Sequence, residues 1–333
     1  MSYVLTVVAQ CGTQFRSFAP YVASISEAGV VAFQAGLPGN RTGVFVWEED
    51  KPRALVESGS GTVSDVYSHP DINEAGDVTF YAAQEPSGTG VFVVANGQIE
   101  CVAALDPAAG RIGPLGPTIS EDGSVAYRTE DGSGECGVHN WSKGKSVAIA
   151  LTDEHFSSFD GLPVVVDRGT LVFRSTSHAG LSEIYLCERG ELTCVVDSAD
   201  EFCQLGRFPS LNEALHVAFV AERSDGSSGA FAVHGGVIQP IAESSDGFSS
   251  FRGVLLPSSE RPIFYATPVG GELGLYAGFG SSSNRILGIG DDFGDSQVIA
   301  FALNPVSINA KGQLAICLAL TNGQQVIVRA DLA

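Results

Sequence analysis

Short apolar stretches alternate with polar, glycine-containing turns along the whole chain. Six segments repeat one pattern, in which a polar turn precedes an apolar block that ends in a large side chain: SISEAGVVAF (24–33), DINEAGDVTF (71–80), TISEDGSVAY (118–127), VVVDRGTLVF (164–173), SLNEALHVAF (210–219) and SINAKGQLAI (307–316). A degenerate seventh copy, LLPSSERPIF, occupies 255–264. From Phe33 to Phe80, and again from Phe80 to Tyr127, the interval is 47 residues. The pattern therefore predicts seven copies of one structural unit.

Two more apolar blocks follow within a unit, for example GVFVW (43–47) and RALVES (53–58) in the first. Together with the residues on either side of the polar turn, they give four short strands per unit. Glycine occupies the turn where a hairpin needs a positive φ, as at Gly29 and Gly76. Four antiparallel strands in about 40–50 residues are typical of a β-propeller blade. We therefore predict an all-β fold, a seven-bladed propeller of four-stranded antiparallel blades.

The last unit predicts how the ring closes. It supplies a first strand (VSIN), a second (QLAICLAL) and a third (QQVIVRADL), but no fourth. The N-terminal segment LTVVAQCG (5–12) matches the missing fourth strand, so we expect residues 5–12 to complete the last blade and remove an open sheet edge. The whole of 1–333 then forms a single domain. Its predicted blades are approximately 17–58, 67–105, 115–152, 161–198, 207–244, 253–290, and 303–330 plus 3–12.

The repeat S-x-N-E-A-G-x-V-A-F, followed by G-V-F-V, resembles uncharacterised bacterial repeats of the propeller clan that includes WD-repeat and kelch proteins. It lacks the Trp-Asp dipeptide of the former and the paired glycines of the latter. The resemblance covers the whole chain and implies the propeller fold. It implies no particular function, because propellers serve as binding proteins, scaffolds and enzymes alike.

The charge balance argues against two classes of partner. The chain has 18 basic and 38 acidic residues, a formal net charge of −20. A phosphate backbone or an anionic membrane surface requires a basic footprint, so we expect neither nucleic acid nor a membrane as partner. A strongly acidic surface also favours a monomer in solution.

Cysteine usage and the N-terminus indicate the compartment. The first residues lack the basic region and cleavage site of a signal peptide, and no apolar run reaches the length of a spanning helix. The seven cysteines are an odd number and contain no Cys-x-x-Cys pair, which indicates reduced thiols. We therefore expect a cytoplasmic protein.

The loops that lead from each fourth strand to the next first strand are the expected ligand-binding elements, because they converge on the central funnel of a propeller. Three of the scarce arginines, Arg16, Arg207 and Arg252, lie in these loops, with Phe159 and Asp160. Arginine recognises carboxylates and phosphates in a bidentate way, so these five residues are the predicted ligand-binding set. The alternative is local ion pairing with an acid such as Asp65, Asp160 or Glu201.

The same loops contain candidate acid/base groups. His155, His69 and Tyr67 are the predicted catalytic residues, because histidine titrates near neutral pH and a tyrosine hydroxyl can assist it. The alternative to a catalytic role is that these loop histidines only make structural hydrogen bonds. The histidines and acids show no metal-ligand spacing, and the chain has no Gly-x-Ser-x-Gly or P-loop motif. We predict no metal and no cofactor.

Three functional hypotheses remain open. The first is a binder of a small, possibly anionic molecule at the mouth of the central funnel. The second is a metal-independent lyase, isomerase or cyclase that uses acid/base residues of the same funnel. The third is a protein-interaction scaffold. The polar, Gly/Ser-rich loops GLPGNRTG (36–43) and ERSDGSSG (222–229) argue against the scaffold.

Overall fold

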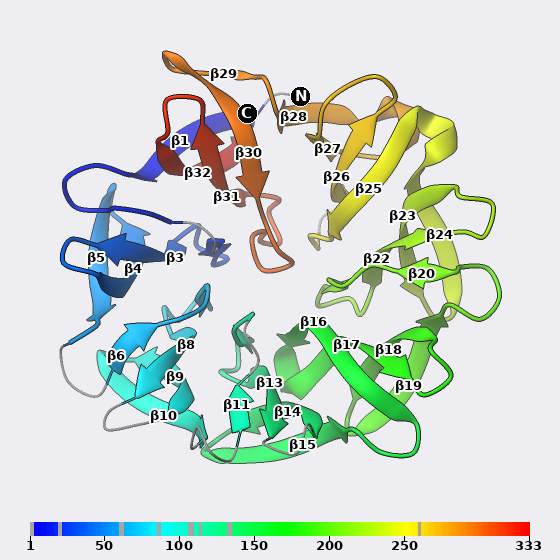
Figure 1. Cartoon of the computed structure of the whole chain (residues 1–333), viewed down its shortest axis with the longest axis horizontal. Coiled ribbons are helices and arrows are strands. Elements are labelled where there is room, and N and C mark those ends of the chain that lie inside the picture. Colours follow the sequence, from blue (N-terminus) through cyan, green and yellow to red (C-terminus); the bar gives the residue numbers. More distant parts are fainter. Residues whose placement is uncertain are drawn as a thin grey trace.

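The computed structural model describes residues 3–18, 22–59, 63–84, 88–105, 110–112, 115–131, 135–258 and 261–333. Within these residues, seven antiparallel sheets are arranged in a ring around a central axis (Figure 1). The all-β, seven-bladed propeller predicted from the repeats is confirmed.

The strand bounds follow the repeat. Blades 1 to 3 contain β2 (Ser24–Ile25), β3 (Val31–Leu37), β4 (Arg41–Glu48) and β5 (Lys51–Glu57); β6 (Val63–Val66), β7 (Asp71–Ile72), β8 (Val78–Gln84), β9 (Thr89–Ala95) and β10 (Gln98–Leu105); and β11 (Gly110–Ile112), β12 (Thr118–Ile119), β13 (Val125–Asp131), β14 (Cys136–Ser142) and β15 (Lys145–Leu151). Blades 4 and 5 contain β16 (Phe156–Val166), β17 (Thr170–Ser177), β18 (Ser182–Glu188) and β19 (Glu191–Asp197); and β20 (Gln204–Leu205), β21 (Ser210–Leu211), β22 (Val217–Glu222), β23 (Ser228–His234) and β24 (Val237–Glu243).

Blades 6 and 7 contain β25 (Phe248–Leu255), β26 (Ile263–Pro268), β27 (Gly274–Ala277) and β28 (Asn284–Gly288); and β29 (Asp292–Phe293), β30 (Ser296–Ala302), β31 (Leu314–Leu320), β32 (Gln325–Leu332) and β1 (Tyr3–Gln10). Three single-turn 3₁₀ helices, η1 (Asp167–Gly169), η2 (Ser244–Asp246) and η3 (Gly280–Ser282), join strands. The described residues include no helix with the length and apolar character needed to cross a bilayer.

A stacked ring pair explains why the repeat ends in an aromatic residue. Phe33 in β3 lies opposite Phe45 in β4, and their rings stack with centroids 5.6 Å apart. The same cross-strand stack recurs in blades 2 to 6: Phe80–Phe92, Tyr127–His139, Phe173–Tyr185, Phe219–Phe231 and Phe264–Tyr276. Facing aromatic residues on neighbouring strands stabilise a sheet, and here they also fill the space between blades.

The ring closes through the N-terminal strand, as predicted. β1 pairs antiparallel with β32, from Tyr3 opposite Leu332 to Gln10 opposite Val326. The strand therefore spans 3–10 rather than 5–12. Pairing continues one residue further, since Cys11 donates its backbone N–H to the Gln325 carbonyl at 2.9 Å. Because β1 is the outermost strand of blade 7, the first and last segments of the chain share one sheet.

In four of the repeats, the first residue bonds its inner strand to the next blade through its side chain. Ser307 Oγ donates to the Ala23 carbonyl at 2.6 Å, and Thr118 Oγ1 donates to the Pro163 carbonyl at 2.9 Å. Ser210 and Asp71 hold the same position in their repeats and accept backbone N–H groups of the following blade. We call Asp71, Thr118, Ser210 and Ser307 the inter-blade belt. All four side chains are buried.

The polar turn of the repeat makes a second layer of bonds between blades. The Asn73 side chain donates to the Ser120 carbonyl at 3.2 Å. The Glu121 carboxylate accepts the backbone N–H of Glu74 at 2.7 Å, and Glu27 accepts that of Ala310 at 2.7 Å. The acids of the Asn-Glu-Ala-Gly motif therefore cap the turn of the preceding blade.

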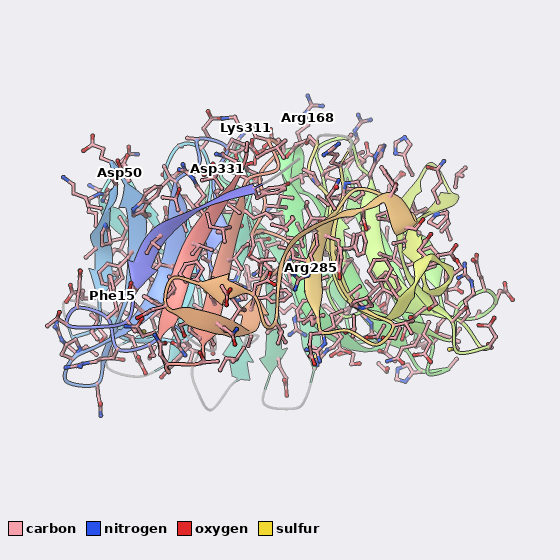
Figure 2. All side chains as sticks on the ribbon, turned by 90° about the horizontal axis from the view of Figure 1, so that it is seen from above. Phe15, Asp50, Arg168, Arg285, Lys311 and Asp331 are labelled. Atoms are coloured by element: carbon pink, nitrogen blue, oxygen red, sulfur yellow. The ribbon has the colours of Figure 1, made fainter. Side chains whose placement is uncertain are left out.

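These turns define one face of the ring, which we call the turn face. Figure 2 shows Arg168 and Lys311, from turns between first and second strands, on the same side as Asp50, from a turn between third and fourth strands. Phe15, from the segment between β1 and β2, lies toward the opposite side. That opposite side, the loop face, carries the connections from second to third strands and from fourth to first strands.

A charge placed inside β1 should open the ring. Val8 is 5% exposed, whereas Val4 on the same strand is 56% exposed. We expect Val8→Asp to lower the free energy of unfolding by on the order of 3–5 kcal/mol, because an unpaired carboxylate is buried. Val4→Asp should change it by less than about 0.5 kcal/mol. Urea denaturation of both variants checks this, and equal stability of the two would contradict the closure.

The buried acid of the inter-blade belt should make stability depend on pH. Burial raises the pKa of Asp71 from 3.8 to about 8. The folded chain therefore keeps a proton that the unfolded chain releases, so this contribution to stability is full below pH 4 and declines as the pH rises to 8. Thr118 holds the equivalent position, and its Oγ1 accepts the Val165 N–H at 3.2 Å. We therefore expect Asp71→Thr to flatten the pH dependence of the unfolding free energy.

The matched variant Asp71→Val leaves the Ile119 N–H without its acceptor. It should lose the same pH dependence but lower the free energy of unfolding by about 1–3 kcal/mol at acidic pH. Denaturant titrations at several pH values would measure both effects. A wild-type pH profile in Asp71→Thr would show that the Asp71 carboxyl does not titrate in this range.

Candidate functional site

Three arginines from consecutive blades surround one carboxylate near the inner strands of blades 3 to 5. Arg128 belongs to β13, Arg174 to β17, and Arg207 to the segment between β20 and β21. Asp160, in the inner strand β16, lies opposite Arg174 in the sheet. We call Arg128, Arg174, Arg207 and Asp160 the arginine cluster. It occupies the loop-face half of the ring, because β17 leads from this point into the connection to β18.

Arg174 is the buried centre of the cluster. Its Nη1 lies 2.6 Å from Asp160 Oδ2, and its Nη2 donates to Ser182 Oγ at 2.7 Å. The side chain is 9% exposed, yet its Nε–H has no hydrogen-bond partner. A buried donor on a charged group that lacks an acceptor is costly, so this N–H is an unsatisfied polar group at the centre of the cluster.

The other two arginines approach from either side. Arg207 Nη2 lies 3.2 Å from Asp160 Oδ1, and its side chain is 64% exposed. Arg128 donates from Nη1 to the Phe159 carbonyl. Burial lowers the pKa of Arg128, and the nearby charges of Asp160 and Arg207 act on it in opposite directions. Glu130 is a weaker electrostatic neighbour, so three guanidinium groups exceed the local carboxylates within a chain of net charge −20.

A glycine fixes the approach of Arg207. Gly161 has φ +70°, and a Cβ at this position would lie 1.6 Å from the Arg207 carbonyl oxygen. Only glycine therefore allows the connection into blade 5 to pack directly on β16. The backbone of Arg207 is held against blade 4 by this contact, while its side chain stays accessible.

A cleft of about 310 Å³ lies between blades 5 and 6, and none of the four residues of the arginine cluster lines it. Gly206, the residue before Arg207, is one wall, and Val220 is another. Val220 follows the repeat aromatic in blade 5, as Arg174 does in blade 4, and its smaller side chain fills less of the gap between blades. The remaining wall is mostly polar: Gln204, Glu222, Ser228, Ser249 and Ser250, with the half-buried Phe251.

A second polar group lies at the loop-face end of blade 4. His155 Nε2 lies 3.1 Å from Glu183 Oε2 and 2.9 Å from the Tyr185 hydroxyl. The Glu183 side chain is 7% exposed and also accepts a bond from Ser175 Oγ at 3.4 Å. We call His155 and Glu183 the dyad.

The dyad fixes the tautomer of His155. A carboxylate only accepts, so the proton resides on Nε2 and Nδ1 of the half-exposed ring is free to accept one. Burial and the nearby Glu183 raise the pKa of Tyr185 to about 12, so its hydroxyl stays protonated. A carboxylate that orients a histidine in this way is the arrangement of a general base.

Of the eight predicted site residues, four lie around blade 4. Asp160 and Arg207 belong to the arginine cluster, and His155 to the dyad. Phe159 is buried and packs on Phe173 with ring centroids 5.7 Å apart, so its backbone carbonyl, not its ring, reaches the cluster.

The other four lie on different blades. Tyr67 packs against Tyr81 in blade 2, with ring centroids 5.6 Å apart, and burial raises its pKa. His69 is buried, burial lowers its pKa to about 4, and its Nε2 has no partner. Arg16 lines a separate cleft of about 530 Å³ beside blade 1. Arg252 is exposed on blade 6, near Tyr265.

The local ion pairing considered from the sequence occurs in part. Arg207 does pair with Asp160. Glu201 pairs with Arg223 at 2.9 Å instead of a candidate arginine, and Asp65 accepts a bond from Thr42 at 2.6 Å. No group of three or more histidine, cysteine or acidic side chains in the described ranges could hold a metal ion.

Four residues of the candidate sites were not predicted from the sequence: Arg128, Arg174, Glu183 and Tyr185. A signal for the arginines exists, since VAYR (125–128) and LVFR (171–174) are the repeats in which arginine follows the aromatic. Strand alternation turns that residue away from the aromatic stack. Glu183 and Tyr185 could be paired with His155 only through the fold.

The comparisons with known proteins establish the fold alone. No protein-family profile and no curated protein sequence matches the chain. Among solved structures, an oligogalacturonate lyase from Vibrio parahaemolyticus is similar over 100% of this chain and 98% of that chain, with 10% identity and a TM-score of 0.62. The β-propeller domain of the Trilobed protease from Pyrococcus furiosus matches 82% of this chain and 84% of that chain, with 13% identity and a TM-score of 0.56. The Cps50 (Swd1) propeller domain from Myceliophteria thermophila covers 96% and 99%, with 10% identity and a TM-score of 0.54. The chain is thus similar in fold to enzymes and to other propellers.

The contact between Gly161 and Arg207 can be tested by adding one methyl group. We expect Gly161→Ala to lower the free energy of unfolding by on the order of 3 kcal/mol, because Cβ and the Arg207 carbonyl cannot occupy the same space. Gly180→Ala is the control, since Gly180 has φ +81° but no atom within 4 Å of the added Cβ. It should cost only about 1 kcal/mol. Equal costs in denaturant titrations would contradict the close packing.

Proposed function

We propose that this propeller binds a small carboxylate-bearing molecule at the arginine cluster. The observation that carries the proposal is the buried guanidinium of Arg174, whose Nε–H lacks a partner beside two further arginines. Guanidinium groups recognise carboxylates through paired N–H bonds, and such charge-assisted bonds gain strength when they are partly buried. The exposed Arg207 closes over the bound group from the solvent side.

Asp160 sets the charge balance of the proposed site. Without ligand it holds Arg174 and Arg207 through its two oxygens. Arg128 donates one N–H to the Phe159 backbone carbonyl and has no ion pair among the described residues. An incoming carboxylate therefore completes the neutralisation of the cluster instead of displacing Asp160.

The cleft between blades 5 and 6 suggests the rest of the ligand, because Gly206 on its wall directly precedes Arg207. Amide and hydroxyl groups of Gln204, Ser228, Ser249 and Ser250 line it, together with the Glu222 carboxylate and one aromatic ring, Phe251. Such walls suit a compact molecule that carries several hydroxyl groups. An acidic sugar combines hydroxyls with a carboxylate, and oligogalacturonate, named for the structurally similar lyase, consists of such sugars. Galacturonate is therefore the first probe.

The remaining expectations accompany this proposal. All seven cysteines lie in described segments and are unpaired, which fits a reducing, cytoplasmic setting. The acidic surface supports a monomer. The loop residues Arg16 and Arg252, and the side chains of Tyr67 and His69, lie on other blades and are not part of the proposed contact.

Removing one arginine should weaken binding selectively. In isothermal titration, galacturonate should bind the wild type, and the neutral sugar galactose should bind far more weakly, because only the former presents a carboxylate. We expect Arg207→Ala to weaken galacturonate binding about 10- to 100-fold, the usual loss of a charged hydrogen bond. Arg207 is exposed, so the fold should be retained.

The matched control is Arg189→Ala. Arg189 is 81% exposed and lies on the turn between β18 and β19, at the turn face. It should bind galacturonate as the wild type does. Equal affinity in Arg207→Ala, or equal affinity of both sugars, would refute the proposal.

A second candidate function, acid/base catalysis, is favoured by the dyad. We expect an enzyme that removes a proton beside a carboxylate group to use Nδ1 of His155, with Glu183 as the orienting group. His155→Gln and Glu183→Gln should then abolish turnover of a carboxylate-bearing sugar while galacturonate still binds. His178→Gln is the control, since His178 is exposed and its Nε2 bonds only the Asp153 carbonyl. Unchanged turnover in the first two variants would leave the chain a binding protein.

A further inference from the structure

Two histidines that the sequence does not bring together face each other on blade 5. His216 precedes β22 and His234 ends β23. Val217 lies opposite Val233 in this hairpin, so His216 and His234 are the next cross-strand pair. Their ring centroids are 4.2 Å apart, with the planes at 64°. Their distance along the sequence gave no ligand spacing, whereas the hairpin register makes them neighbours.

The two imidazole rings make no polar contact with the rest of the described chain. Within the described chain, neither imidazole has a hydrogen bond or an ion pair. The rings meet edge to face, and their nitrogens bond no other group of the described chain. Both imidazoles therefore have ring nitrogens that a cation can bind.

The turn that carries His216 is strained. Leu215 has φ +60°, at the position where earlier repeats have Gly29, Gly76 and Gly123. A branched side chain in the left-handed region costs about 1–2 kcal/mol, so the turn is held there by its surroundings. The His216 N–H bonds Asn212 Oδ1 at 3.1 Å, which fixes the backbone that presents the ring.

A cleft beside His216 leaves space for additional groups to coordinate a cation bound by the two histidines. His216 lines a cleft of about 410 Å³ between blades 5 and 6, with Asn212 and Gln239 among its polar walls. The exposed His234 lies at the end of the same hairpin. A cation held by both rings would therefore keep open positions for water or for a donor atom of another molecule.

We propose that His216 and His234 form a two-histidine site for a divalent first-row transition ion such as Cu²⁺ or Zn²⁺. Imidazole nitrogen suits both ions, and the order of intrinsic affinities favours Cu²⁺ over Zn²⁺. Two cis ligands with open positions bind more weakly than a closed four-ligand site. The site lies on blade 5 and is independent of the arginine cluster.

Titration of the untagged full-length chain with CuCl₂ and with ZnCl₂ tests this site. In a background in which the exposed Cys101, Cys194 and Cys203 are changed to serine, which removes competing thiol ligands, the expected result is one ion per chain, with Cu²⁺ bound more tightly than Zn²⁺. His216→Asn and His234→Asn should each weaken Cu²⁺ binding at least about tenfold, since one of two imidazole ligands is lost. His178→Asn, which removes an exposed histidine of blade 4, should bind as the wild type does.

Two further readouts separate ligation from folding. The melting temperature without metal should be alike in the wild type and His234→Asn, because the His234 ring is exposed. The electron paramagnetic resonance spectrum of the Cu²⁺ form should show coupling to two nitrogens, and to one in His234→Asn. Binding that is unchanged in both histidine variants, or a stoichiometry below one ion per chain at saturating Cu²⁺, would overturn the site.

Discussion

The bonds between neighbouring inner strands are the interaction on which the rest of this ring depends. A blade has apolar faces on both sides, and apolar contact alone does not set how far one blade slides past the next. The inter-blade belt and the capped turns supply that register, since both consist of directional hydrogen bonds, and those of the belt are buried. The polar residues of the repeat therefore help to hold the fold together, as the apolar residues do.

The arginine cluster is a consequence of that register. Asp160 meets Arg207 because blade 5 is fixed against blade 4, with Gly161 as the point of contact. A shift of blade 5 by one residue would separate these two charges. The dyad forms differently, within blade 4, because His155 directly precedes β16 and Glu183 lies on β18 of the same sheet.

The number of blades, the strand order and the closure of the ring could be predicted from the sequence, because they depend on a repeat period that the sequence shows directly. The start of β1 moved by two residues, since edge-strand ends depend on local pairing. The residues of the candidate site were harder to predict. The scarcity of arginine pointed to Arg207, which joins the arginine cluster, but also to Arg16 and Arg252, which lie on other blades. Arg174 and Glu183 lie inside strands and not in loops, and only the pairing of strands within blade 4 shows that they face Asp160 and His155. The pairing of His216 with His234 likewise depends on hairpin register rather than on spacing.

The acidic turns have one more consequence, which concerns kinetics. Burial raises the pKa of Glu121, and the neighbouring charges of Glu27, Glu74 and Asp167 raise it further, so several carboxylates share the turn-face end of the axis. The arginine cluster lies toward the loop face. The two ends of the ring therefore differ in electrostatic potential, and an anion diffusing toward the axis is repelled at one end and attracted at the other. Capture of an anion would then be directional, with an association rate that falls as salt screens the difference.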